Sequence, residues 1–392
     1  MALDRQRRKL LKLGLVKLGL AKRSLFKLGL GSLGAGFALG GTNLATAQRV
    51  LDNQENRRQW FFSAVDDPEG NHHLAGIHRD GSEYFLLPAP ERCHGGCLHP
   101  HQPQAVLFAR RPGRHFHVVD ARHHRELQSI DAGPGYHFYG HGVFDPSGRW
   151  LYVTANRLED AMGLVRVYDA NAGYAHHHDI ELDGIGPHEL KLMPDGDTLI
   201  VALGGIRTHP DSGRIKLNLE DMDPALLLVN RHSGEIQARH RPSHHQLSVR
   251  HLDVAANGSV IVGYQFEGPV WETHHPLVAH LDPQGKFHEF DLGELQPKLA
   301  QYTASVAVSQ SQSGSSSSTL ITAPRGGRII MLDQQSGDII AAPELADAAG
   351  ARCDGQGGYI VTTGNGGFYQ VSAQGGLTQL AKLPLRWDNH LT

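Results

Sequence analysis

The sequence predicts an all-β fold, a seven-bladed β-propeller whose ring is closed by the C-terminal segment. Two observations lead to this prediction. His94, His141 and His188 follow one another at equal intervals of 47 residues, and each stands in front of a short apolar run. Runs such as GLVRVYDA and RIIMLDQQSG have the pattern of strands, and few stretches have the apolar spacing of a helix. A period of about 40–50 residues built from short strands and turns is typical of propeller blades.

Each blade is expected to be a four-stranded antiparallel sheet whose first strand lines the central channel. We expect six of these inner strands to begin after His94, His141, His188, His251, Ser305 and Asp354. Between the first two strands of a blade, the segment 145–148 (DPSG) is an expected tight turn, because Asp, Pro and Gly each favour turns.

The seventh blade is expected to join the two ends of the domain. Residues 60–90 have the pattern of the second, third and fourth strands of a blade, without an inner strand before them. We expect the C-terminal segment RWDNHLT to supply that inner strand, which would give His390 the position that His141 has in its own blade. Closure of this kind leaves no exposed sheet edge in the ring.

The N-terminal residues 1–47 are expected to be a twin-arginine-like export signal rather than part of the fold. They contain Arg7 and Arg8, a second basic block at 22–27, and a glycine-rich apolar run that ends at ATA. That run is too short and too rich in glycine for a good membrane span. We therefore expect residues 48–392 to form one periplasmic propeller domain without a membrane span; a retained N-terminal anchor is the alternative.

Composition narrows the possible partners. The chain of 392 residues has a formal net charge of −3, so no general basic field for nucleic acid is expected, and we expect a monomer.

The odd number of cysteines leaves at least one unpaired. Cys97 is expected to be a small buried apolar residue. Cys93 and Cys353 are expected at the same end of the propeller but two blades apart, too far for a disulfide.

The histidines that mark the blades are the candidate metal ligands. An inner strand that starts at one face of the ring returns to that face through the second strand, so the histidines and the loops after the second strands should share one mouth of the channel. The candidate ligands are His94, His141, His188, His251 and His390. Neutral imidazoles bind Zn, Cu, Ni or Fe, and Glu189 and Asp388 offer oxygen ligands beside them. In the alternative interpretation each histidine ties its blade to the backbone of the next one, and the sequence leaves both open.

Basic residues in the loops at the same mouth are candidates for binding an anion or an anionic metal complex, because guanidinium groups bind carboxylates and phosphates. Together with Glu189, these candidates are Arg110, Arg111, Arg157, Arg207, His209, Arg214 and Arg325. Solvated loop arginines are the alternative. The sequence has no phosphate-binding loop, nucleophile elbow, H-E-x-x-H helix or C-x-x-C-H haem site.

Several motifs carry a family resemblance. GHGVFDPSGRWLYVT, GIGPHELKLMPDGDTLIVALGGIRTHPDSGR, HQLSVRHLDV, PRGG and WDNHL resemble the bacterial family called domain of unknown function 1513, over about residues 60–392. The resemblance implies a periplasmic propeller of the WD40-like or YVTN-like kind. It also implies partners in iron acquisition, namely imelysin-type iron-regulated proteins and a di-haem oxidoreductase. It implies no catalytic residue, and the segment RCHGGCLHP departs from the family pattern.

These features together predict a non-enzymatic propeller that binds a metal ion (iron, copper or zinc) or an anionic metal complex. The rivals are a propeller enzyme, such as a lactonase, hydrolase or oxidoreductase, and a platform for protein–protein interaction. The expected mouth is richer in His and Arg than in Asp and Glu. A metal-dependent enzyme would need carboxylates around an open coordination position, so binding is favoured.

Overall fold

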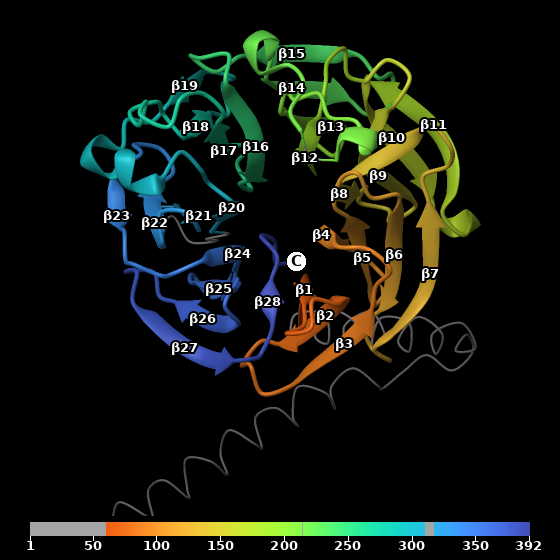
Figure 1. Ribbon diagram of the computed structural model, residues 1–392, viewed down its shortest axis with the longest axis horizontal. Coiled ribbons are helices and arrows are strands. Elements are labelled where there is room, and N and C mark those ends of the chain that lie inside the picture. Colours follow the sequence, from red (N-terminus) through yellow and green to blue (C-terminus); the bar gives the residue numbers. More distant parts are fainter. Residues whose placement is uncertain (1–59, 214, 310–316) are drawn as a thin grey trace, which may run out of the picture. The chain divides into compact units, whose positions relative to one another are not determined.

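A computed structural model of the protein describes residues 60–309, except residue 214, and residues 317–392. These residues form seven four-stranded antiparallel sheets arranged as the blades of a propeller (Figure 1). The predicted all-β, seven-bladed architecture is therefore confirmed. The predicted export signal, residues 1–47, and Arg214 lie outside the described residues. In the part that is described, no helix is long and apolar enough to cross a lipid bilayer.

Each blade has four strands, ordered from the channel outward. Blade 1 comprises β28 (Arg386–Trp387), β1 (Trp60–Asp66), β2 (His72–His78) and β3 (Tyr84–Pro88). Blade 2 comprises β4 (Cys93–Leu98), β5 (Gln104–Ala109), β6 (His115–Asp120) and β7 (Arg125–Asp131). Blade 3 comprises β8 (Tyr136–Phe144), β9 (Trp150–Arg157), β10 (Gly163–Asp169) and β11 (Ala175–Glu181). Blade 4 comprises β12 (Pro187–Leu192), β13 (Thr198–Leu203), β14 (Ala225–Asn230) and β15 (Ile236–His240).

The remaining three blades follow in chain order. Blade 5 comprises β16 (Leu247–Val254), β17 (Val260–Phe266), β18 (Val278–Leu281) and β19 (Phe287–Glu289). Blade 6 comprises β20 (Ser305–Val308), β21 (Ser318–Ala323), β22 (Arg328–Asp333) and β23 (Ile339–Ala341). Blade 7 comprises β24 (Ala348–Cys353), β25 (Tyr359–Thr363), β26 (Gly367–Val371) and β27 (Leu377–Lys382). Short 3-10 helices occur in the loops at η1 (Ala170–Ala172), η2 (Pro210–Ser212), η3 (Leu219–Asp221), η4 (Gly293–Leu295) and η5 (Pro297–Leu299).

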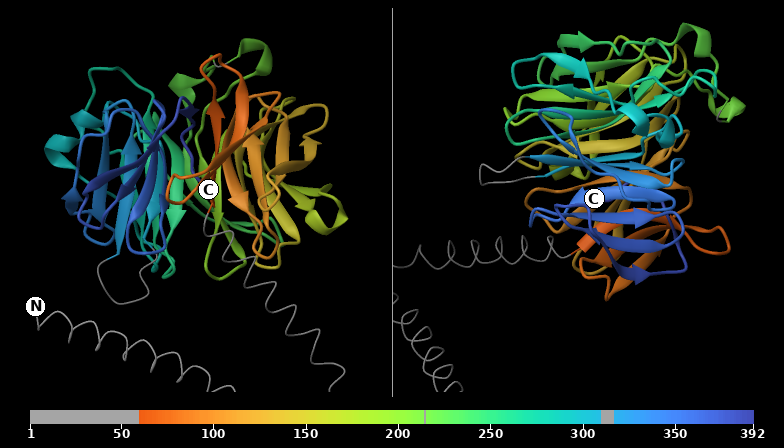
Figure 2. Two further views of the ribbon diagram at one scale, coloured as in Figure 1. Left: turned by 90° about the horizontal axis from the view of Figure 1, so that it is seen from below. Right: turned by 90° about the vertical axis from the view of Figure 1, so that its left-hand side faces the viewer.

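The turn between the first two strands of a blade forms as its sequence predicts. In blade 3 the Asp145 carboxylate accepts hydrogen bonds from the Trp150 backbone N–H (2.9 Å) and the Ser147 hydroxyl (2.7 Å). Gly148 has φ +74°, a conformation that disfavours other residues. The strands run between two faces of the ring (Figure 2), so this turn returns the chain to the face where the inner strand began.

The hydrophobic core lies mainly between neighbouring blades. One cluster combines Val106 and Phe108 of blade 2 with Phe138 and Val153 of blade 3, and all four side chains are buried. Similar clusters join the other blades. Each sheet therefore depends on its neighbours for burial of its apolar faces, and the ring is stable only when it is closed.

The C-terminal segment closes the ring, as predicted. β28 pairs with β1, and farther along the backbones of Thr392 and Phe62 exchange two hydrogen bonds of 2.8 Å. The Trp387 side chain is 3% exposed and packs in a cluster that includes Phe61 of blade 1 and Phe368 of blade 7. The inner strand of blade 1 therefore comes from the opposite end of the chain.

Two expectations about blade 7 and the cysteines are wrong. The inner strand of this blade is β24, which ends just before Asp354 instead of beginning after it. The reason is local: the Asp354 carboxylate accepts backbone N–H bonds from Gln356 and Gly358 and so forms the turn into β25. As a result, Cys353 ends its inner strand whereas Cys93 begins one, so the two lie at opposite ends of their strands. No disulfide forms among the cysteines.

Replacing Trp387 by alanine is expected to lower the free energy of unfolding by about 3–5 kcal/mol, the usual range for a buried Trp. Trp271, which is 78% exposed, is the matched control, and its replacement by alanine should change stability by less than about 0.5 kcal/mol. Chemical denaturation measures both. Equal effects of the two substitutions would contradict the role of the C-terminal segment in closing the ring.

Candidate metal centre

Irregularities in the inner strands place the histidines in the channel. The pairing register of β8 with β9 shifts around His141, and similar shifts occur around His94 in β4, around His188 in β12 and just before His251 in β16. Such β-bulges re-aim a side chain that regular pairing would place elsewhere. β8 begins at Tyr136, so its histidine lies within the inner strand and does not precede it as expected.

Glycines beside the histidines make room for close packing of the rings. Gly140 has φ +102°, and a Cβ atom there would lie 2.9 Å from the Cβ of His94. A Cβ atom on Gly95 would lie 2.7 Å from Nδ1 of His141. A side chain at either glycine would displace a ring. The close packing of the rings therefore requires glycine in the segments 140–142 (GHG) and 94–96 (HGG).

All five predicted histidine ligands come together in the channel. Their ring centroids lie between 4.5 and 6.4 Å apart for the pairs in contact. The members of this histidine cluster are His94, His141, His188, His251 and His390, each at most 8% exposed. They come from five different blades, so the cluster exists only in the assembled ring.

Two carboxylates contact the cluster, and each lies next to a histidine ring of an adjacent blade. Asp388 Oδ1 lies 2.6 Å from Nδ1 of His94. Glu189 lies between two rings, with Oε2 3.3 Å from Nδ1 of His251 and Oε1 3.8 Å from Nδ1 of His141. When a carboxylate accepts the Nδ1–H of a histidine, the Nε2 lone pair of that histidine is available to bind a metal.

The side chains offer two overlapping sets of ligand atoms. In one set, His141, Glu189, His251 and His390 each have a ligand atom within 4.8 Å of the others. In the second set, His94, His141 and His188 meet the same distance criterion. His141 belongs to both sets and is therefore the central residue of the candidate centre.

Burial sets the charge state of these groups. It lowers the pKa of His94 to about 4 and those of His141, His188, His251 and His390 below the ordinary range. Burial alone would raise the pKa of the Asp388 and Glu189 carboxyls. His94 and Arg110 more than offset burial at Asp388, and Lys191 and His141 do so at Glu189, so both pKa values lie below the usual range. At neutral pH the site therefore presents neutral imidazoles beside ionised carboxylates.

Three ring nitrogens of the cluster are buried and have no hydrogen-bond partner among the described residues: Nε2 of His141, Nδ1 of His188 and Nε2 of His390. A buried polar atom without a partner costs about 1–3 kcal/mol. In the described part of the chain, none of the five rings hydrogen-bonds the backbone of a neighbouring blade. These unpartnered ring nitrogens favour ligand binding over the blade-tethering interpretation.

Blade 6 shows how a tether is made in this protein. Ser305 marks blade 6 in the way that histidines mark other blades, and its hydroxyl oxygen lies 3.4 Å from the Ala351 carbonyl and 3.1 Å from the Ala351 N–H of blade 7. The Thr322 hydroxyl likewise donates to the Ala349 carbonyl (2.7 Å). Hydroxyl groups therefore join these blades to each other, which leaves the histidines for another role.

Four of the predicted loop residues, Arg157, Arg207, His209 and Arg325, have no hydrogen bond or ion pair to the histidine cluster among the described contacts. Arg157 pairs with Asp160 and Glu181. Arg207 is exposed, and His209 lies 3.5 Å from the Asp211 carboxylate. Arg325 is also exposed, with its guanidinium carbon 4.6 Å from the centre of the Tyr302 ring.

Of the predicted loop residues, Arg110 contacts a carboxylate of the site, as do Arg92 and Lys191, which were not predicted. Arg110 Nη1 lies 3.8 Å from Asp388 Oδ2, and Arg92 Nε lies 2.6 Å from the same oxygen. Lys191 Nζ lies 3.3 Å from Glu189 Oε1. Arg250, which is 7% exposed, was missed from the sequence, although it directly precedes a predicted ligand in the segment SVRHLDV.

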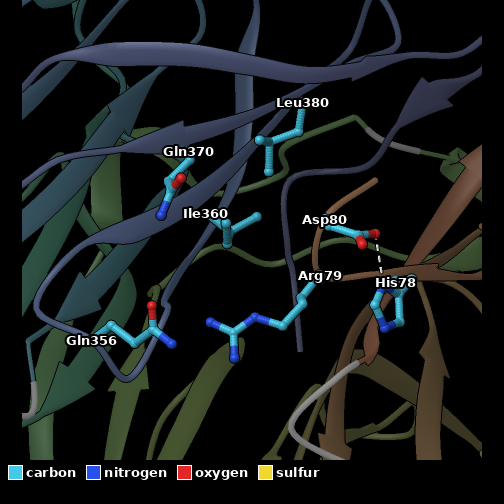
Figure 3. Close-up of a pocket in the computed structure, with 7 residues that line it drawn as sticks. All are labelled: His78, Arg79, Asp80, Gln356, Ile360, Gln370 and Leu380. Carbon is cyan, nitrogen blue, oxygen red and sulfur yellow. Dashed lines mark hydrogen bonds and ion pairs between the residues drawn. The ribbon is translucent and has the colours of Figure 1, made fainter. Parts of the chain in front are cut away.

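A separate depression of about 460 Å³ lies between blades 1 and 7 (Figure 3). Its lining residues are His78, Arg79, Asp80, Gln356, Ile360, Gln370 and Leu380. Gln356 belongs to the turn that follows β24, so the depression is at the face opposite the start of the inner strands. Its residues are not part of the histidine cluster.

Comparisons with known proteins place the fold but give no activity. A family model described as "Protein of unknown function (DUF1513)" matches residues 87–392. Hydrazine synthase of Kuenenia stuttgartiensis is a similar solved structure, with a TM-score of 0.56 and 15% sequence identity over 82% of this chain and 94% of that chain. At this identity the likeness shows the fold alone. No curated protein matches the chain.

Metal-free protein is expected to lose stability as the pH falls from about 6.5 to about 4. Burial lowers the pKa of His94 from 6.5 to about 4, so in this window the unfolded chain binds protons that the folded chain does not, and stability present above pH 6.5 is lost. Chemical denaturation with a chelator present, at stepped pH, measures the slope.

Replacing His141 by glutamine removes one such group and should make that slope shallower. His123→Gln is the control, because the His123 side chain is 63% exposed. If the His141→Gln variant kept the full slope, this ring would not be held neutral by burial.

Proposed function

The chain belongs to the DUF1513 family, whose description names no activity, and we propose that it binds a transition-metal ion at the histidine cluster in its channel. The observation that carries the proposal is the convergence of five buried imidazoles from five blades, three of them with a ring nitrogen that lacks a partner among the described residues. A protein has little other use for several neutral imidazoles in contact with an ionised carboxylate.

The chemistry of the donors indicates the class of metal. Imidazole nitrogen with one carboxylate oxygen suits Zn, Cu, Ni and Fe, whereas Mg and Ca prefer oxygen ligands alone. Cys93 is adjacent to His94, but its sulfur belongs to neither of the two sets of converging ligand atoms. The centre is therefore a nitrogen–oxygen site in which His141 and Glu189 have the main contacts.

The proposal extends to the place of the chain in the cell. We propose a periplasmic protein of iron acquisition, with imelysin-type proteins and a di-haem oxidoreductase as partners; the support is the resemblance of the sequence motifs. Iron fits the donor set, and so do copper and zinc. Metal analysis of protein purified from its own host distinguishes the three.

The His141→Gln variant is expected to weaken metal binding more than about 100-fold, because even residues that only orient a ligand are worth 10–100-fold. Glu189→Gln should also weaken binding, since it removes both an oxygen ligand and the acceptor that orients His251. His232→Gln is the control, with its ring exposed and bonded to Asp197. Competition with a chromophoric chelator, on untagged full chain, measures each dissociation constant.

Loss of binding in the first two variants but not in the control is the expected result. Equal metal content in all four proteins would place the metal on surface histidines such as 176–178 and contradict the proposal. Thermal melting of the metal-free proteins separates loss of ligands from loss of the fold.

A further inference from the structure

Arginines of blades 2 and 5 lie beside the histidine cluster. Arg110 and Arg111 follow β5, and Arg250 lies within β16 directly before His251. Arg110 approaches Asp388, which is itself the partner of a clustered ring. This places guanidinium groups at the side of the cluster where the loops after the second strands begin.

Arg111 is a buried cation that no carboxylate of the described residues neutralises. The residue is 9% exposed, and its guanidinium carbon lies 5.6 Å from the centre of the Tyr139 ring. Across residues 60–309 and 317–392, residue 214 apart, no carboxylate lies within ion-pairing distance of it. Burial of an unpaired charge is unfavourable, and it persists where the charge meets a ligand.

Arg250 is also poorly neutralised. Its Nη2 lies 2.9 Å from Glu267 Oε1, but Lys216 pairs with the other oxygen of the same carboxylate. Its Nε is buried and has no partner in the described part of the protein. Burial lowers the pKa of the Arg250 guanidinium, and repulsion from the positive charge of Arg111 lowers it further.

Polar groups without partners lie beside these arginines. The Tyr139 hydroxyl, Nε2 of His137 and the side-chain amide of Asn156 are buried and make no hydrogen bond to any described residue. The His137 and Tyr139 rings are 5.2 Å apart, and the β8–β9 pairing puts Asn156 opposite His137. The Tyr139 hydroxyl and the Asn156 amide provide O–H and N–H donors on this side of the Arg111 guanidinium, whereas His137 donates its Nδ1–H to the Phe138 carbonyl, so its Nε2 is an acceptor.

We propose that this arginine mouth, formed by Arg111, Arg250 and Tyr139, binds a small oxyanion, either a carboxylate or an inorganic oxyanion. Guanidinium groups bind such anions through paired N–H donors, and low exposure strengthens the attraction. If the metal ion of the proposed function is bound, the anion lies next to it and is an additional ligand; this part of the inference rests on the proposed function. The anion site itself stands on the unpaired charges.

Calorimetric titration of the full chain tests the inference, with citrate in one arm and inorganic phosphate in the other, each with metal-free and metal-loaded protein. The wild type is expected to bind at least one of the two anions. Arg111→Gln should weaken that binding more than about tenfold, through loss of a charge-assisted pair. Arg125→Gln, on the outer strand of blade 2 with its side chain 67% exposed, should leave it unchanged.

The melting temperature separates a binding role from a structural one. If Arg111 serves a ligand, Arg111→Met should melt without anion at or above the wild-type temperature, and anion should no longer raise it. A lowered melting temperature with unchanged anion affinity would overturn the inference in favour of a packing role.

The two proposals fail in different ways. Metal binding without response to either anion overturns the anion site alone. Anion binding without metal binding overturns the metal centre alone and leaves the arginine mouth in place.

Discussion

Burial of five imidazoles in one channel is the constraint on which the site depends. Water that would otherwise protonate and solvate the rings is excluded, so burial lowers their pKa values and they remain neutral. The two carboxylates that contact them, Asp388 and Glu189, are each balanced by a basic residue, Arg92 and Lys191 respectively. What remains unsatisfied is the set of unpartnered ring nitrogens of His141, His188 and His390, and a bound metal ion is a partner that satisfies several of them together.

The propeller supplies this geometry because each blade contributes one inner strand. Bulges in β4, β8, β12 and β16 aim their histidines at one another, and the C-terminal segment adds His390 when it closes the ring. The inner strands of blades 6 and 7, β20 and β24, contain no histidine. Ser305 joins their backbones, and a Cβ atom on Gly350 would lie 2.6 Å from the His390 carbonyl carbon. Hydroxyl tethers also join histidine-bearing blades, as in the bond from Ser248 of blade 5 to the Gly204 carbonyl of blade 4, so tethers and ligands are made by different side chains.

The sequence predicted the fold, the closure and the full histidine set because these follow from a repeat with a fixed period and from strand alternation. It failed in blade 7, which has no histidine to mark its inner strand. Asp354, predicted to precede an inner strand, forms the turn after one, and Cys353 was therefore predicted at the wrong end of its strand. The ion-pair partners of the arginines could be predicted from the sequence only in part. Asp160, three residues after Arg157, is visible in the local sequence as a partner, but no local feature shows that Arg111 is buried with no described carboxylate beside it.

The most direct test of the metal centre is anomalous diffraction from crystals of the full chain loaded with iron, copper or zinc in turn, recorded at the absorption edge of each metal. We expect a peak in the channel at about 2.0–2.3 Å from an imidazole nitrogen of His141 and from further ligands of the cluster. A peak only at exposed histidines, with none in the channel for any of the three metals, would contradict the metal centre.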